Sequence, residues 1–196
     1  MIHPAAQIIR DEHSALAAML RSMRMLIAGG PRDEPERFFD VLRAMLFYID
    51  EFPERLHHPK ESRLLFPKVA AGAPELARLI GRLDADHEAG ERRARDLQHH
   101  LLAWELLGDS HREAFVAEVH SYIDFYLEHM RLEEREVLPA AERVLSDGDW
   151  DELHKVFARD RDPLASGVVD ACYERLFTRI VLKTPAPIGV GPAMVG

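Results

Sequence analysis

The apolar residues of this 196-residue chain recur at alternating steps of three and four along almost its whole length. This spacing places them on one face of an α-helix. The clearest stretch runs through Ile80, Leu83, His87, Gly90, Ala94, Leu97 and Leu101. No run of alternating β-branched residues is long enough to predict a strand. The sequence therefore predicts an all-α protein.

Turn signals divide this pattern into four long helices. Loops are expected at Gly29-Gly30-Pro31, at Ala71 to Pro74, and at Gly108-Asp109. Pro53 and Pro59 are expected to kink, break or restart the second helix, because proline lacks an N–H group and crowds the carbonyl four residues back. Long helices joined by short loops favour an antiparallel up-down four-helix bundle, which we assign to residues 1–146.

The remaining residues predict an extension and a tail. Residues 147–183 are expected to form two shorter helices, at about Asp149 to Ala158 and Leu164 to Leu182, that pack on the outside or end of the bundle. Residues 184–196 hold three Pro and three Gly with no apolar period. Such a composition predicts a mobile tail or a loosely packed strap.

Composition excludes several classes of function. Lys and Arg number 25 against 34 Asp and Glu, a net charge of −9, and no segment concentrates basic residues, so nucleic-acid binding is disfavoured. The single Cys172 excludes an internal disulfide and any cysteine-based metal site. Charged residues precede any long apolar run, so we expect a cytoplasmic protein with no membrane partner. The oligomeric state stays open, with a homodimer as one alternative.

Four of the eleven histidines fall on the predicted inner faces, one per helix: His13, His57, His87 and His129. Glu61 and Glu133 each follow a histidine by four residues and share its helical face. In an antiparallel pair, residues at one depth are equidistant from the turn. The midpoints of successive histidines fall at residues 108, 72 and 35, within or beside the predicted loops. The four histidines therefore share one layer.

Such a layer favours bound metal. Burying these polar groups costs several kcal/mol unless a cation satisfies them. Imidazole and carboxylate ligands suit iron, manganese or zinc, and two carboxylates from different helices can bridge two ions. Glu91 is a further ligand or lies behind the ligands, and Tyr126 is the better tyrosine candidate for a contact with them. His58 is expected to point away, but it replaces His57 if the Pro59 kink rotates the chain.

Taken together, these motifs resemble the hemerythrin-like, histidine-histidine-glutamate cation-binding family, and its bacterial branch in particular. The matching stretches are Asp11-Glu12-His13, His57-His58-Pro59-Lys60-Glu61, Leu65-Phe66-Pro67, Asp86-His87-Glu88, His129 to Glu134, and Val137-Leu138-Pro139. The resemblance implies a four-helix bundle with two iron ions joined by an oxo or hydroxo bridge, and with dioxygen or a related molecule as ligand.

The resemblance also implies residue roles. His13 and His57 would bind one iron, His87 and His129 the other, with Glu61 and Glu133 bridging. Oxygen-carrying hemerythrins have a further histidine four residues after the third-helix ligand, where this chain has Glu91. That exchange disfavours reversible oxygen carriage and favours sensing, iron handling, or a response to nitric oxide or peroxide.

Several functions stay open at this point. The chain is either a protein that binds O2, NO or peroxide, or an enzyme that turns over peroxide or nitric oxide. A zinc or manganese protein and a metal-independent helical scaffold are further alternatives. A ferritin-like enzyme would need two Glu-x-x-His motifs, and only Glu54 to His57 offers one.

Overall fold

The computed structural model describes residues 3–31, 34–167 and 173–183, and every regular element within these ranges is a helix. The prediction of an all-α protein is confirmed. Cys172 and the predicted tail, residues 184–196, lie outside the described residues.

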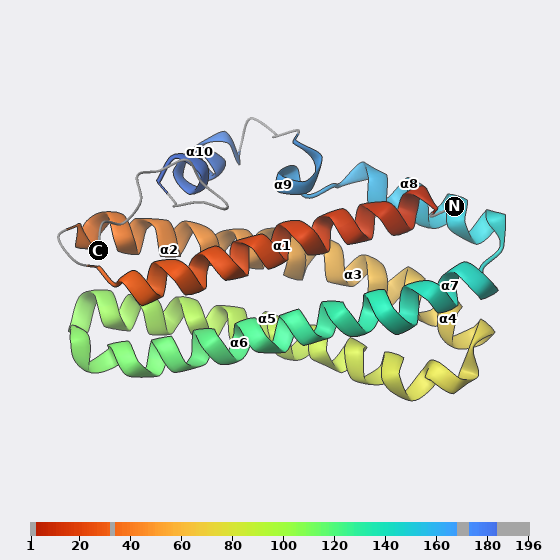
Figure 1. The fold of residues 1–196 in the computed structure, drawn as a ribbon, viewed down its shortest axis with the longest axis horizontal. Helices are drawn as coiled ribbons and strands as arrows, with labels where there is room; N and C mark the ends of the chain where they lie inside the picture. Colours follow the sequence, from red (N-terminus) through yellow and green to blue (C-terminus); the bar gives the residue numbers. More distant parts are fainter. Residues whose placement is uncertain (1–2, 32–33, 168–172, 184–196) are drawn as a thin grey trace.

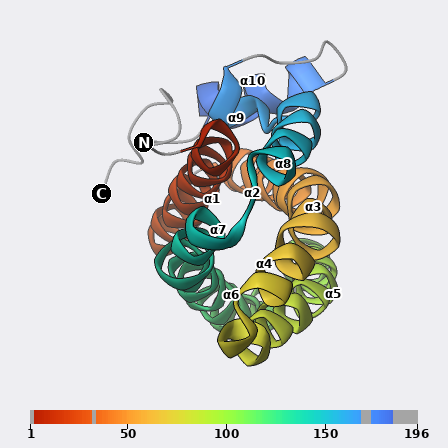
Figure 2. The ribbon, with the colours of Figure 1, turned by 90° about the vertical axis from the view of Figure 1, so that its right-hand side faces the viewer.

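Four long helical segments lie side by side (Figure 1). The first is α1 (Pro4–Gly29), and the third is a short turn η3 (Pro74–Leu76) followed by α5 (Ala77–Leu107). The second comprises α2 (Pro35–Ile49), η1 (Asp50–His57), α3 (His58–Lys60), η2 (Glu61–Leu65) and α4 (Phe66–Gly72). The fourth comprises η4 (Asp109–His111), α6 (Arg112–Leu132), η5 (Glu133–Val137) and α7 (Leu138–Val144). Helix α1 packs on α2 and α6, and α5 also packs on α2 and α6, so the segments surround a common interior (Figure 2).

The apolar interior consists of two clusters rather than one. Leu16, Ala94 and Tyr126 belong to the first cluster. Ile9, Leu83, Phe66 and Val137 belong to the second. On each of the four segments the chain passes from one cluster to the other across one or more buried polar residues, such as His13 between Ile9 and Leu16. A polar layer therefore crosses the interior at one depth.

Prolines widen the helices where they meet this layer. Pro53 lies inside the π-helical segment η1, and the chain stays helical from Pro35 to Gly72 instead of breaking there. Pro67 and Pro139 each follow a π-helical segment that begins six residues earlier, at Glu61 and at Glu133. Proline cannot donate to the carbonyl four residues back, so the preceding turn takes the wider spacing. The two glutamates thus occupy matching positions on two segments.

The extension differs from its prediction. Ser146 caps α8 (Asp147–Arg159) through a reciprocal contact with Asp149. The single helix expected over 164–182 is divided, because α9 (Pro163–Ser166) ends at Gly167, whose φ of 70° is a left-handed conformation that ends helices. Helix α10 (Glu174–Lys183) follows, so the described residues hold three extra helices instead of two. Helices α8 and α9 pack on α1, and α10 packs on α2.

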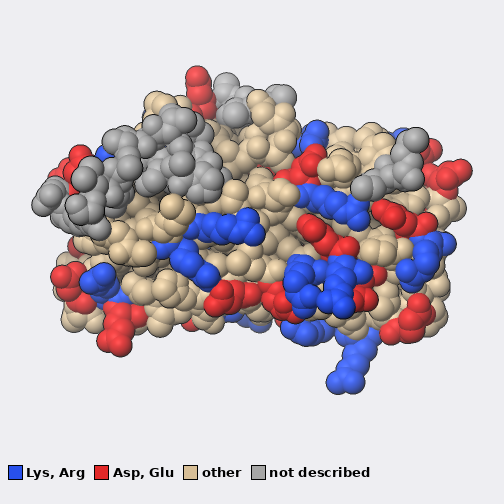
Figure 3. All heavy atoms as spheres, viewed as in Figure 1, with Lys and Arg blue, Asp and Glu red and all other residues tan. Residues whose placement is uncertain are grey.

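The surface carries both signs of charge. Acidic and basic side chains are interspersed over the face seen in Figure 3. Within the described ranges, no helix combines the length and apolar character needed to cross a membrane.

We expect alanine substitutions at two glycines of α5 to have opposite effects on the free energy of unfolding. A Cβ atom on Gly90 would lie 1.7 Å from the hydroxyl oxygen of the buried Tyr126, whereas one on Gly81 would meet nothing within 4 Å. We expect Gly90→Ala to lower the free energy of unfolding by about 1–3 kcal/mol through overpacking. Gly81→Ala, the matched control, should raise it by about 0.5–1 kcal/mol. Urea unfolding of the metal-free proteins measures both, and equal effects would contradict this account of the α5–α6 contact.

Candidate metal centre

The polar layer contains five buried histidines and two buried glutamates. They come from all four long segments: His13, His57, His58, Glu61, His87, His129 and Glu133. Within the described residues, three groups of these side chains could each hold a metal ion, because their ligand atoms lie within 4.8 Å of one another. Glu61 and His87 each belong to two groups, so the groups form one continuous centre.

The first side of the centre is built by His13, His57 and Glu61. The Nε2 atoms of His13 and His57 lie 3.2 Å apart, and Oε1 of Glu61 is 3.3 Å from Nε2 of His57. Oε2 of Glu133 is 3.3 Å from Nε2 of His13. Two imidazoles and one oxygen from each carboxylate therefore face a shared position.

Hydrogen bonds behind these two rings orient them. Nδ1 of His57 donates to Glu12 at 2.7 Å, and Nδ1 of His13 donates to Glu134 at 3.1 Å. Since a carboxylate only accepts, Nδ1 of each ring carries a hydrogen, and the two Nε2 atoms face each other. A proton or a metal cation between the two Nε2 atoms prevents repulsion of their lone pairs. Partners of this kind are the ones that metal-bound histidines have.

The second side is built by His58, His87 and His129. The Nε2 atoms of His87 and His129 lie 2.9 Å apart. The His58 ring stacks on His87, with ring centroids 4.3 Å apart. Oε1 of Glu133 is 3.1 Å from Nε2 of His129, and Oε2 of Glu61 is 3.6 Å from Nε2 of His87. This side therefore has one imidazole more than the first.

Each glutamate faces both sides of the centre. Glu61 directs Oε1 towards His57 and Oε2 towards His87, and Glu133 directs Oε2 towards His13 and Oε1 towards His129. Both side chains are buried, and none of these four oxygens has a hydrogen-bond partner among the described residues. Four buried oxygens in this state are costly unless a cation binds them. Their arrangement suits two ions bridged by two carboxylates.

Charge pairing dominates the electrostatics of the protein without metal. Burial opposes ionisation of Glu133, but the charge of His129 holds its pKa well below the usual value. Burial disfavours charge on His129 too, yet Glu133 raises the pKa of His129 to about 10. Burial and the nearby positive charges of His87 and His57 lower the pKa of His58 well below the usual value. His58 is therefore neutral and keeps a lone pair for a metal ion.

A buried hydrogen-bond network lies behind His58. Its Nδ1 donates to Oε2 of Glu54 at 3.0 Å, and the other oxygen of Glu54 accepts from the hydroxyls of Tyr122 and Tyr126, both at 2.7 Å. The Tyr126 ring also stacks on His58, with centroids 5.2 Å apart. Burial raises the pKa of Glu54. The network fixes the His58 ring from two directions.

The structure brings together six of the predicted ligands: His13, His57, Glu61, His87, His129 and Glu133. It also places Tyr126 behind the ligands, at Glu54. Glu91 is not brought into the centre, because it pairs with Arg95 near the surface. We expected either His57 or His58 to enter the centre, but in the structure both rings enter it. Consecutive helical residues are about 100° apart, so His57 faces α1 and His58 faces α5 and α6.

The sequence-based prediction does not include Glu54 or Glu12 in the site, and it includes His58 only as a replacement for His57. A sequence signal exists for Glu54 and His58, because Glu54, His57, His58 and Glu61 follow the spacing i, i+3, i+4, i+7 that marks one helical face. A polar stripe of this kind on an otherwise buried helix indicates a site. Glu12 has no such signal, since its partner is 45 residues away.

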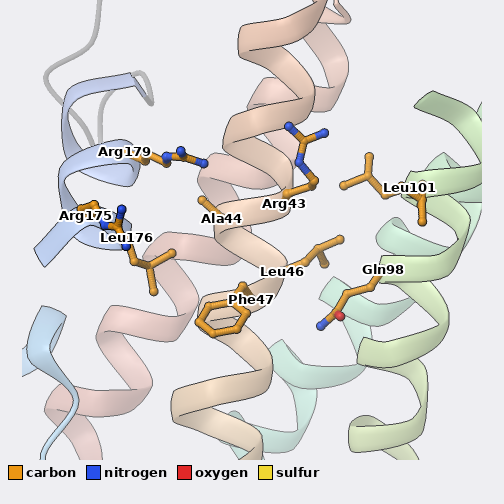
Figure 4. A pocket seen from close by; sticks show the side chains of 10 residues that line it. Arg43, Ala44, Leu46, Phe47, Gln98, Leu101, Arg175, Leu176 and Arg179 are labelled. Carbon is orange, nitrogen blue, oxygen red and sulfur yellow. The ribbon is translucent and has the colours of Figure 1, made fainter. Parts of the chain in front are cut away.

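A cavity of about 210 Å³ reaches the second side of the centre. Its lining includes His58 and His87 from the layer, Glu54 behind them, and Arg63, Glu88 and Glu91 nearer the surface. A larger groove of about 650 Å³ lies between α2, α5 and α10 (Figure 4). Among the described residues that line this groove there is no His, Cys, Asp or Glu, so it offers no metal ligand.

Comparison with known proteins agrees with this geometry. The family model for the hemerythrin HHE cation-binding domain matches residues 5–141, which span every side chain of the polar layer. No match was found among curated proteins. The chain belongs to the hemerythrin HHE cation-binding domain family.

Proposed function

We propose that this protein holds two iron ions in the polar layer and binds O2, NO or a related small ligand there. Its fold is then the antiparallel up-down four-helix bundle that the sequence predicts. One observation carries the proposal: Glu61 and Glu133 each present one oxygen to the His13–His57 side and one to the side of His87, and none of these oxygens has a hydrogen bond within the described residues. Two ions would satisfy all four oxygens together.

The ligand set is compatible with iron. It contains imidazole and carboxylate groups and no thiolate, a set suited to iron, with zinc or manganese as the alternatives. His13 and His57 with two carboxylate oxygens give the first ion four ligands. His58, His87 and His129 with the other two oxygens give the second ion five. Iron commonly takes six ligands, which leaves positions for a small molecule.

His58 weakens the argument that Glu91, in place of a histidine, disfavours reversible oxygen binding. In oxygen-carrying hemerythrins the extra imidazole comes from the third helix, and Glu91 occupies that place here. His58 supplies an imidazole from the second segment instead, stacked on His87 at 4.3 Å. The number of histidines at the centre is then not reduced, so the absence of a histidine at residue 91 does not itself argue against oxygen binding.

Metal analysis of glutamate variants tests the dinuclear centre. The parent chain, loaded anaerobically with ferrous iron, should hold two ions. Glu133→Ala should weaken binding by more than the ~10–100-fold typical of losing a ligand's hydrogen-bond partner, because it removes an oxygen from each ion. Glu136→Ala is the matched control, since Glu136 lies on the same segment and its part-exposed side chain pairs with Arg135. Full retention of iron by Glu133→Ala would contradict the proposal.

The cavity beside His58 and His87 predicts the route of the ligand. Glu91→Trp should narrow it and slow NO binding to the iron-loaded protein by about tenfold, roughly the effect of 1.4 kcal/mol on a rate. Glu91→Ala is the control and should leave the rate at or above that of the parent. Stopped-flow spectroscopy measures the rates, and iron content is measured on the same samples. An unchanged rate in Glu91→Trp would show that ligands enter elsewhere.

The second candidate function is an enzyme that turns over peroxide or nitric oxide. The Glu54 network favours it, because two phenol hydroxyls and one carboxyl beside His58 form a buried path for protons. The iron-loaded protein separates the candidates when it is mixed with excess peroxide. Sustained peroxide loss that falls in Tyr126→Phe would favour the enzyme, and one stable spectral species per centre would favour the binding protein.

A further inference from the structure

The connector between α8 and α9, residues 160–162, reaches the metal centre through a single glutamate. Oε2 of Glu12 accepts from Nδ1 of His57 at 2.7 Å, and its Oε1 accepts from the backbone N–H of Asp162 at 2.9 Å. Glu12 and Asp162 are both buried. Each oxygen of Glu12 thus has one donor. Glu12 therefore links His57, on the first side of the centre, to the extension.

Other contacts hold this connector in place. The hydroxyl of the buried Tyr48 donates to the carboxylate of Asp162, whose other oxygen accepts from the N–H of Leu164 at 2.8 Å. Lys60, which lies between His57 and Glu61 in sequence, donates to the backbone oxygen of Asp160 at 2.6 Å. The connector is therefore fixed by residues of the second segment as well as by α1.

Helix α8 also covers the outer side of His57. The ring of the buried Phe157 meets the His57 ring edge-on, with centroids 5.9 Å apart, and the Lys60 ammonium lies 5.4 Å from the Phe157 centroid. Water thus has little access to the Glu12–His57 hydrogen bond, which strengthens that bond.

The remaining imidazoles depend on different residues. The outer nitrogens of His13, His58 and His87 contact Glu134, Glu54 and Ser62, and that of His129 lies 3.5 Å from Asp86. All four of these partners belong to the long segments. The extension therefore acts on one side of the centre, the side of His13 and His57.

We propose that the extension beyond the family domain is a working part of the metal centre: the Asp162 N–H holds Glu12, and Glu12 holds the His57 ring with Nε2 towards the first ion. Asp162 and Glu12 are positioning residues, since neither is a ligand. The family match ends at residue 141, so the link is added by the chain outside the matched region. This inference rests on the proposed dinuclear centre. It predicts that loosening the connector weakens one ion and spares the other.

Substitution of Asp162 in the full-length chain tests the link. Asp162→Pro removes the backbone N–H, and the native φ of −58° is one that proline adopts. Asp162→Ala also loses the side chain but keeps the N–H. Zn²⁺ titration against a competing chelator should show two ions in the parent. In Asp162→Pro one ion should bind ~10–100-fold more weakly and the other unchanged. Asp162→Ala should show a clearly smaller loss.

A spectroscopic measurement separates positioning from general loss of stability. In the zinc-loaded parent, the Nδ1 hydrogen of His57 should give a slowly exchanging NMR signal, which should shift and exchange faster in Asp162→Pro. If that variant fails to fold, Glu12→Gln replaces it, because an NH2 group that only donates then takes the place of one of the two accepting oxygens. Asp151→Ala, on the exposed face of α8, is the control and should match the parent.

Weaker binding of one ion with the other unchanged in Asp162→Pro or Glu12→Gln, together with the altered His57 signal, supports the link. Equal loss at both ions, parent-like affinity at both ions, or equal effects of Asp162→Pro and Asp162→Ala would overturn it. A parent chain that does not bind two ions would instead overturn the proposed function.

Discussion

The structure depends on the pairing of two buried carboxylates, Glu61 and Glu133, with four buried imidazoles at one depth of the interior. Apolar packing alone would not tolerate this layer, because isolated charges lose several kcal/mol on leaving water. Without metal, charged imidazoles balance Glu61 and Glu133, as the raised pKa of His129 at about 10 indicates. The cation-binding family match and the carboxylate oxygens that lack a hydrogen bond within the described residues both favour metal ions as the groups that complete the balance.

The backbone around the layer follows from the same requirement. Glu61 and Glu133 each begin a π-helical segment that ends before a Phe-Pro or Leu-Pro pair, so two segments present a carboxylate in the same way. Apolar clusters on both sides then fix the depth of the layer. Rigid helices hold the ligands, and the extension holds one of them further through Glu12. The positions of these side chains are thus set by packing and hydrogen bonds within the chain.

Much of this could be predicted from sequence. Apolar periodicity predicts the helices, and the midpoints of His13, His57, His87 and His129 predict their common depth, because both depend on regular geometry. The polar spacing of Glu54, His57, His58 and Glu61 points to the entry of His58. The π-helical turns around Pro53 and Pro59, which alter the helical phase, could not be predicted from periodicity. Glu12 and Asp162 meet across 150 residues, and no local pattern predicts such a contact. The division of the last helix depends on the left-handed conformation of Gly167.

Anomalous X-ray scattering from crystals of the iron-loaded protein tests the central claim most directly. Data collected on both sides of the iron absorption edge locate each ion without reference to the protein. The account predicts two iron peaks in the polar layer, one beside His13 and His57 and one beside His58, His87 and His129, with Glu61 and Glu133 contacting both. A single peak, or two peaks that share neither glutamate, would contradict it.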